Sequence, residues 1–122
     1  MKIRIKGNSV RFRLSKTEIE KFKQTGLLTE QTEFGDSIFS YAIKADAACE
    51  ELKASFANNT LTVIVPAPIH QEWTNSDVVG FENKWAFSKD KELFILIEKD
   101  FVCLDNTFED QSDNYPNPNA FC

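Results

Sequence analysis

Basic and apolar side chains alternate through most of the first fourteen residues, and this pattern points most directly to chemistry. Successive side chains of a β-strand point to opposite faces, so the stretch predicts one apolar face and one basic face. Guanidinium groups bind carboxylates and phosphates through two parallel hydrogen bonds, and ammonium groups bind them as point charges. We therefore expect an anion-binding basic strip, formed by Lys2, Arg4, Lys6, Arg11 and Arg13.

A charged row on a strand also has two purely structural explanations. It can be the solvated face of a sheet, or an edge strand whose charges prevent aggregation. If the strip binds an anion, the candidates are an anionic small molecule and the chain's own C-terminal arm. Residues 1–24 contain eight Lys or Arg and two Glu, whereas residues 101–122 contain four Asp or Glu and no Lys or Arg. Surface ion pairs contribute only about 0–1 kcal/mol each, so an ordered arm would also need apolar anchors.

Two carboxylates, Glu98 and Asp100, follow an uninterrupted apolar run. That run predicts a central strand, residues 92–101, covered on both faces. A carboxylate at the end of a covered strand can have a shifted pKa and act as an acid or base. The alternative function is therefore a small enzyme that acts on a phosphorylated or carboxylated substrate. More commonly such a group is solvated or pairs with a nearby arginine, here Arg4 or Arg13.

The remaining reactive residue types show no supporting spacing. The three cysteines, Cys49, Cys103 and Cys122, cannot all pair within one chain and lack a C-x-x-C motif, which favours reduced thiols. His70 is the single histidine, so neither a Cys-His pair nor a metal site is indicated. The four glycines are scattered singly, without a phosphate-binding loop. We expect neither a metal nor a cofactor.

Composition limits the class of protein. The net charge of −5 and the pI near 4.9 argue against a nucleic-acid-binding protein. The sequence shows neither a signal peptide nor an apolar run approaching the roughly 18 residues of a membrane span, so we expect a soluble, cytoplasmic protein without a membrane partner. The length of 122 residues suits one domain, at residues 1–103, with an acidic arm, residues 104–122, packed on it. A monomer and a homodimer both remain open.

Local signals predict two helices. Ser15 followed by Glu18 forms a capping box, and Gly26 suits the left-handed residue after a helix end, which places the first helix at residues 16–25. Pro68 suits the first position of a second, short helix at residues 68–75.

Turn residues predict antiparallel hairpins at Gly35-Asp36 and at Asn58-Asn59. Residues 78–82 form a short strand candidate and residues 83–91 a polar connection. No strand-helix-strand crossover is evident, so we expect an α+β fold: a mostly antiparallel curled sheet or open barrel of about six to eight strands.

Four stretches of sequence resemble an uncharacterised family of small bacterial proteins, a domain of unknown function. They are MKIRIKGNSVRFRLSKTEIEKF at the front, VGFENKW and LFILIEKDFVCLDN near the end, and EDQSDNYPNP in the arm. The resemblance covers nearly the whole chain. It implies a bacterial origin, a stand-alone domain and an arm that belongs to that domain. The family has no assigned activity, so the resemblance assigns no role to any residue.

Overall fold

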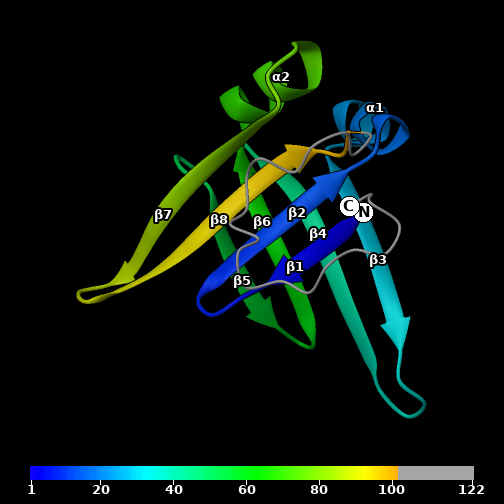
Figure 1. The fold of residues 1–122 in the computed structure, drawn as a ribbon, viewed down its shortest axis with the longest axis vertical. Coiled ribbons are helices and arrows are strands. Elements are labelled where there is room, and N and C mark those ends of the chain that lie inside the picture. The colour runs from blue at the N-terminus through cyan, green and yellow to red at the C-terminus, as the bar shows by residue number, and fades with distance from the viewer. Residues whose placement is uncertain (102–122) are drawn as a thin grey trace, which may run out of the picture.

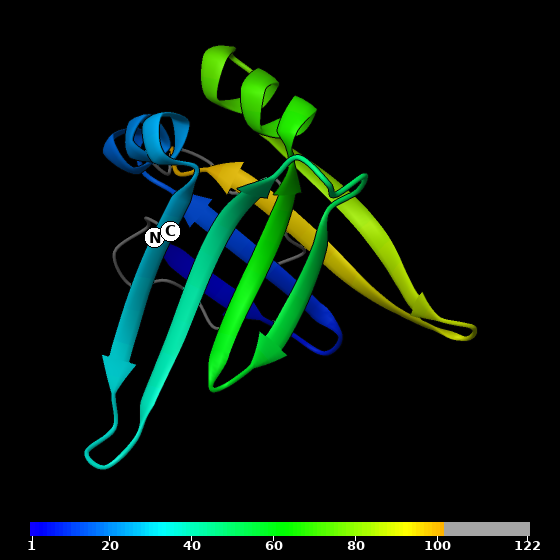
Figure 2. The ribbon, with the colours of Figure 1, turned by 180° about the vertical axis from the view of Figure 1, so that it is seen from behind.

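The computed structural model describes residues 1–101, which form two four-stranded sheets with two helices at one end (Figures 1 and 2). Sheet A has the order β1 (Lys2–Ile5), β2 (Ser9–Leu14), β8 (Lys91–Lys99) and β7 (Gly80–Ser88). Sheet B has the order β3 (Leu27–Glu33), β4 (Ile38–Asp46), β6 (Thr60–Pro66) and β5 (Lys53–Ala57). The helices are α1 (Lys16–Thr25) and α2 (Ala67–Asn75). Within this part of the chain, neither helix has the length and hydrophobicity needed to cross a bilayer.

Helix α1 begins and ends at the predicted residues. The Ser15 side chain accepts a hydrogen bond from the Glu18 backbone N–H, and the Glu18 carboxylate accepts one from the Ser15 N–H at 2.8 Å. At the other end Gly26 has a φ of 70° and donates its N–H to the Phe22 carbonyl at 2.8 Å. The predicted α2 is also confirmed, one residue longer at its start.

Both hairpins predicted from turn residues are confirmed. Asn58 and Asn59 have φ values of 53° and 58°, in the left-handed region where Asn is one of the favoured residues. Their strands pair as expected, with Phe56 opposite Leu61. The β3–β4 hairpin is likewise antiparallel, with Leu28 opposite Ile43.

The arrangement of the sheets differs from the expected curled antiparallel sheet or open barrel. Each sheet is mixed, because its two central strands are parallel: β2 pairs with β8, and β4 with β6. The α+β description therefore holds only loosely for a chain that is mostly strand. Parallel neighbours are not joined by a tight turn, so no short sequence motif predicts which strands pair.

Strand β7 corrects a second expectation. The predicted short strand and polar connection are one nine-residue strand that pairs with β8. The polar residue Asn83 faces inward and interrupts the apolar alternation, so the pattern did not predict the full length of the strand. Its amide is satisfied in the structure, since Nδ2 donates to the Leu52 carbonyl at 2.8 Å. Trp85 and Phe87 consequently lie on a strand rather than in a loop, with ring centroids 5.3 Å apart.

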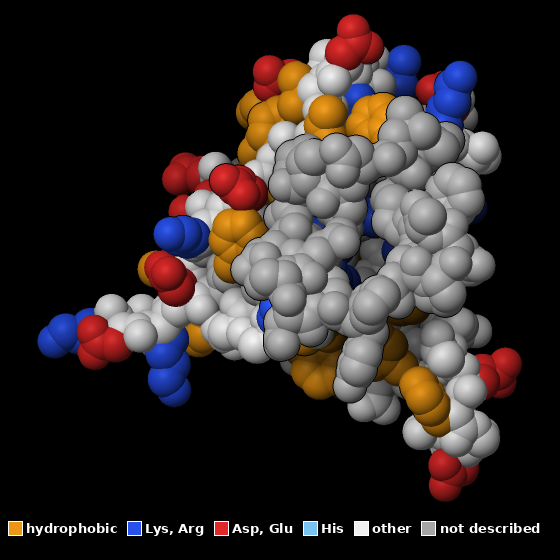
Figure 3. Space-filling view, in the orientation of Figure 1, with side chains coloured by type: hydrophobic (Ala, Val, Ile, Leu, Met, Phe, Trp, Pro, Cys, Tyr) orange, Lys and Arg blue, Asp and Glu red, His pale blue; other side chains and the backbone are white. Residues whose placement is uncertain are grey.

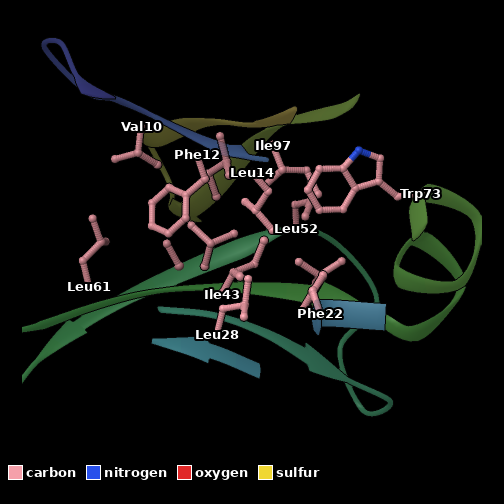
Figure 4. Packing of buried hydrophobic residues seen from close by; sticks show 14 of the residues in the cluster. Val10, Phe12, Leu14, Phe22, Leu28, Ile43, Leu52, Leu61, Trp73 and Ile97 are labelled. Atoms are coloured by element: carbon pink, nitrogen blue, oxygen red, sulfur yellow. The ribbon is translucent and has the colours of Figure 1, made fainter. Parts of the chain in front are cut away.

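The hydrophobic core fills the space between the sheets and continues under the helices (Figure 4). Trp73 of α2 and Phe22 of α1 both point into it and are fully buried. Burial of each such side chain stabilises the fold by about 1.5–3 kcal/mol. The buried cluster also includes Val10, Phe12, Leu14, Ile19, Leu28, Ile43, Leu52, Ala54, Leu61, Val63, Val65, Ile95 and Ile97.

The described chain consists of two halves with the same order of elements. The order strand, strand, helix, strand, strand occurs twice, as β1-β2-α1-β3-β4 and as β5-β6-α2-β7-β8. Exchanging the two halves converts the order of sheet A into that of sheet B, so the two halves have the same topology. Each sheet takes two strands from each half. Each half also contains one strand-helix-strand connection, β2-α1-β3 or β6-α2-β7, which joins the two sheets and is not a crossover within one sheet.

Two equivalent residues of the two halves contact each other where the helices meet. Phe22 and Trp73 occupy the same position in α1 and α2, and their ring centroids are 6.1 Å apart. A polar contact also joins the two sheets at the equivalent place in each half. The amino group of Met1 contacts Glu30 at 2.7 Å, and on the other side Asn83 holds the carbonyl of Leu52. The repeat of the two halves supplies an internal comparison for any surface of one sheet.

Candidate anion-binding surface

Four of the predicted basic residues lie together on the outer face of sheet A. Because Val10, Phe12 and Leu14 of β2 are buried, the alternate residues Arg11 and Arg13 point away from the core. The register of β1 places Arg4 opposite Arg11 and Lys2 opposite Arg13. We call these four side chains the basic face: Lys2, Arg4, Arg11 and Arg13.

Lys6, the fifth residue of the predicted strip, is not on a strand. It lies in the turn between β1 and β2, where its backbone exchanges two hydrogen bonds with Ser9, of 3.2 and 3.1 Å. We therefore leave Lys6 out of the basic face.

The structure brings Glu98 to the basic face. The parallel register of β2 and β8 places Glu98 beside Arg13, whose Nε donates to Glu98 Oε1 at 2.6 Å. The Nε of Arg11 lies 3.6 Å from the same oxygen. Glu98 is 8% exposed and is the one buried charged residue in the described part of the chain. The expected pairing of this carboxylate with an arginine is confirmed.

Asp100 lies at the end of the same face. Its backbone N–H donates to the Leu14 carbonyl at 2.8 Å, which continues the alignment of the chain beside β2. Its carboxylate contacts Lys2 Nζ at 2.8 Å. The hydrogen bond from Lys2 lowers the pKa of Asp100 below its usual value, and burial opposes this effect only in part.

The two arginines of β2 lie close enough to affect each other. Burial and the positive charges of Arg13 and Arg4 lower the pKa of Arg11, and Glu98 opposes the shift. Both arginines contact Glu98 through their Nε atoms.

Gly80 of β7 sits opposite Glu98 on the other side of β8. A Cβ at this position would lie 2.2 Å from the carbonyl oxygen of Ile97 and 3.0 Å from the Cβ of Glu98. The glycine therefore permits the close approach of β7 that holds Glu98 in place.

Sheet B provides the internal comparison, because its outer face has the same strand arrangement. The positions equivalent to Arg4, Arg11 and Arg13 are Ser55, Thr62 and Ile64. Glu98 is replaced by Lys44, and only Lys2 has a like-charged counterpart, Lys53. The topology does not require arginine at these positions, which weakens the explanation of the basic face as an ordinary solvated sheet.

Other reactive groups form no comparable site. His70 packs at the helix interface, with its Nε2 2.8 Å from the Phe22 carbonyl oxygen. Cys49 is a buried free thiol whose Sγ donates to the Glu51 carbonyl at 2.7 Å. No group of three metal-ligating side chains occurs within residues 1–101. Cys103 and Cys122, and the expected packing of the acidic arm, lie outside the described residues.

The end of the sandwich opposite the helices carries a different chemistry. Phe56, Phe34 and Ile5 are exposed there, and an open depression near the β7–β8 tip includes Phe87 and Lys91 among its lining residues. Basic and acidic side chains both gather at that tip (Figure 3). This surface could not be identified from the sequence, because it is assembled from the ends of four hairpins.

Of the comparisons with known proteins, only the comparison with sequence families gives a match. A family model described as a family of unknown function (DUF7009) matches residues 1–119. No match was found among curated proteins or among solved structures.

Proposed function

The chain belongs to this family of unknown function, and from the chemistry of the basic face we propose that it binds an anionic ligand there. The ligand carries carboxylate or phosphate groups, which the guanidiniums of Arg4, Arg11 and Arg13 bind through paired hydrogen bonds. Lys2 adds positive charge at the end of the face. Glu98 keeps the two arginines of β2 in position.

The difference between the two sheets is the observation that carries this proposal. Equivalent outer faces have three arginines in sheet A, and Ser55, Thr62 and Ile64 in sheet B. A requirement for solubility or for protection of an edge would apply to both sheets. A row of arginines on one of them fits a ligand.

The spacing of the basic groups favours an extended ligand. The pair formed by Lys2 and Arg13 and the pair formed by Arg4 and Arg11 are two residues apart along their strands, which is about 6.6–7 Å. Charges in an extended acidic chain repeat over a similar length. The groups also stand along two neighbouring strands rather than around a cavity, which suits a chain that lies across the sheet.

The alternative, a small enzyme with Glu98 or Asp100 as acid or base, has weaker support. Glu98 contacts Arg11 and Arg13, which it helps to position. The lowered pKa of Asp100 keeps this carboxylate ionised near neutral pH, so it is unsuited to donating a proton. The cytoplasmic location, the bacterial origin and the oligomeric state stay predictions from sequence.

Binding of a labelled hexaglutamate peptide to the full chain tests the proposal. We expect Arg11→Gln/Arg13→Gln to weaken binding by at least about tenfold, since hydrogen bonds to charged groups contribute about 1.5–3 kcal/mol each. Fluorescence anisotropy at low salt measures the affinity. Inorganic tripolyphosphate as competitor tests whether phosphate is accepted at the same groups.

The matched control is Lys44→Gln/Lys53→Gln, which removes the same charge from the outer face of sheet B. We expect this variant to bind within about twofold of the parent, apart from general electrostatic effects. Arg4→Gln is the second test variant, because Arg4 lies on the exposed strand β1 and its loss leaves the Glu98 contacts in place. Equal losses in the arginine and lysine variants would contradict the proposal.

A further inference from the structure

We propose that residues 102–122 of this chain dock on the basic face and compete there with the external anion. This inference rests on the proposed function, because it names a partner for the same arginines. The occupant is therefore a segment of the chain itself, recognised by its carboxylates and held in place by its aromatic side chains.

The composition of the segment matches the chemistry of the face. Its charged residues are all acidic: Asp105, Glu109, Asp110 and Asp113. It also contains three aromatic residues: Phe108, Tyr115 and Phe121. The outer face of β8 adds half-buried Phe94 and Leu96 beside the arginines, so the surface offers apolar contacts as well as positive charge.

The point where the described chain ends favours this partner. Asp100 is bound to both Leu14 and Lys2, so the described chain ends, at Phe101, near the margin of the basic face. A segment of 21 residues reaches up to about 70 Å when extended, more than twice the roughly 30 Å of a nine-residue strand. Such a tether raises the effective concentration of the carboxylates at the arginines to about the millimolar range.

Two further observations select this segment and this face. The family match continues to residue 119, so nearly the whole segment is part of what the family shares. The outer face of sheet B has Ser55, Thr62 and Ile64 in place of the three arginines, and therefore lacks the corresponding positive charge.

A spin label within the acidic stretch locates the segment directly. The full chain carries Ser112→Cys for labelling, with Cys103→Ser and Cys122→Ser to remove the two other thiols of the segment, and Cys49 stays because it is buried. We expect paramagnetic broadening of the backbone amides of Arg11, Arg13 and Leu96. The equivalent amides of Thr62, Ile64 and Ala42 should stay unaffected.

Neutralising the segment tests the competition. The full-length variant Asp105→Asn/Glu109→Gln/Asp110→Asn/Asp113→Asn should lose the broadening and bind the hexaglutamate peptide about tenfold more tightly than the parent. This factor is expected when an effective concentration of about 1 mM exceeds the segment's own dissociation constant about tenfold. The matched control, Glu33→Gln/Asp36→Asn/Glu50→Gln/Asp90→Asn, removes four exposed acidic charges elsewhere and should leave the broadening in place.

The outcomes separate the inference from the proposed function. Broadening on sheet A together with tighter binding by the neutralised variant supports both. Arginine-dependent binding that is equal in the parent and the neutralised variant, or broadening that is absent from sheet A, overturns the inference and leaves the proposed function standing. Absence of peptide binding by both proteins overturns the proposed function.

Discussion

At the residue scale, Glu98 has two opposing effects on the basic face. Its carboxylate contacts Arg13 at 2.6 Å and Arg11 at 3.6 Å, so it reduces the repulsion between the two guanidiniums. The same charge repels an anionic ligand that approaches them. The Glu98 carboxylate therefore both stabilises the arginines and weakens the binding of an anion to them.

Glu98→Gln should separate these effects. We expect the free energy of unfolding to fall by about 1–3 kcal/mol, because a buried charged hydrogen bond is weakened. The affinity for the hexaglutamate peptide should rise by about fivefold, or about 1 kcal/mol. Urea unfolding and anisotropy measure the two quantities, and Glu33→Gln on β3 is the control for net charge. A variant with lower stability and lower affinity would indicate that Glu98 only positions the arginines.

The lowered pKa of Asp100 predicts a pH dependence of stability. A carboxyl whose pKa is lower in the folded than in the unfolded state stabilises the fold above its unfolded pKa, near 3.8, and loses this contribution as the pH falls through the folded pKa. Asp100→Asn should therefore be less stable than the parent at about pH 7, and this difference should vanish in strong acid. Urea unfolding across the pH range measures it. A difference that persists below the folded pKa would show that the charge is not its source.

At the element scale, the close approach of β7 to β8 depends on Gly80. Gly80→Ala should lower the free energy of unfolding by about 1–3 kcal/mol, because a Cβ 2.2 Å from the Ile97 carbonyl oxygen forces the strands to shift. Gly35→Ala is the control, since no atom lies within 4 Å of its added Cβ and only its φ of 90° opposes the change. A smaller loss at Gly80 than at Gly35, measured in urea, would contradict this role.

Elements with a complete local signal were predictable from sequence. Helix α1 has its capping box at Ser15 and its left-handed Gly26, and the β5–β6 hairpin has two asparagines with positive φ. Strand β7 was predicted too short because Asn83 faces inward, where its amide donates to the carbonyl of Leu52, just before β5 of the other sheet. That partner is 31 residues away and could not be inferred from the strand itself.

At the scale of the whole molecule, the basic residues were predictable but their surroundings were not. Arg13 and Glu98 are 85 residues apart and meet through a parallel strand pair, for which no turn gives a signal. The repeat of the two halves could not be recognised from the sequence either. Equivalent positions share a backbone conformation but differ in residue type. Gly7 and Asn58, for example, both have a φ of 53°.

The repeat of the two halves makes the central claim testable within one protein. We propose that the outer face of sheet A binds anions and that the equivalent face of sheet B does not. Both faces belong to the same folded chain, so pH, salt and protein concentration are identical for the two. Backbone amides at equivalent positions can therefore be compared directly.

The most direct measurement is an amide chemical-shift titration of the full chain, in its neutralised-segment form, with hexaglutamate peptide at low salt. The account predicts saturable shifts at Arg4, Arg11, Arg13 and Leu96, which decrease as salt is added. It predicts no comparable shifts at Ser55, Thr62, Ile64 and Ala42. Shifts of equal size on both faces, or shifts confined to sheet B, would contradict it.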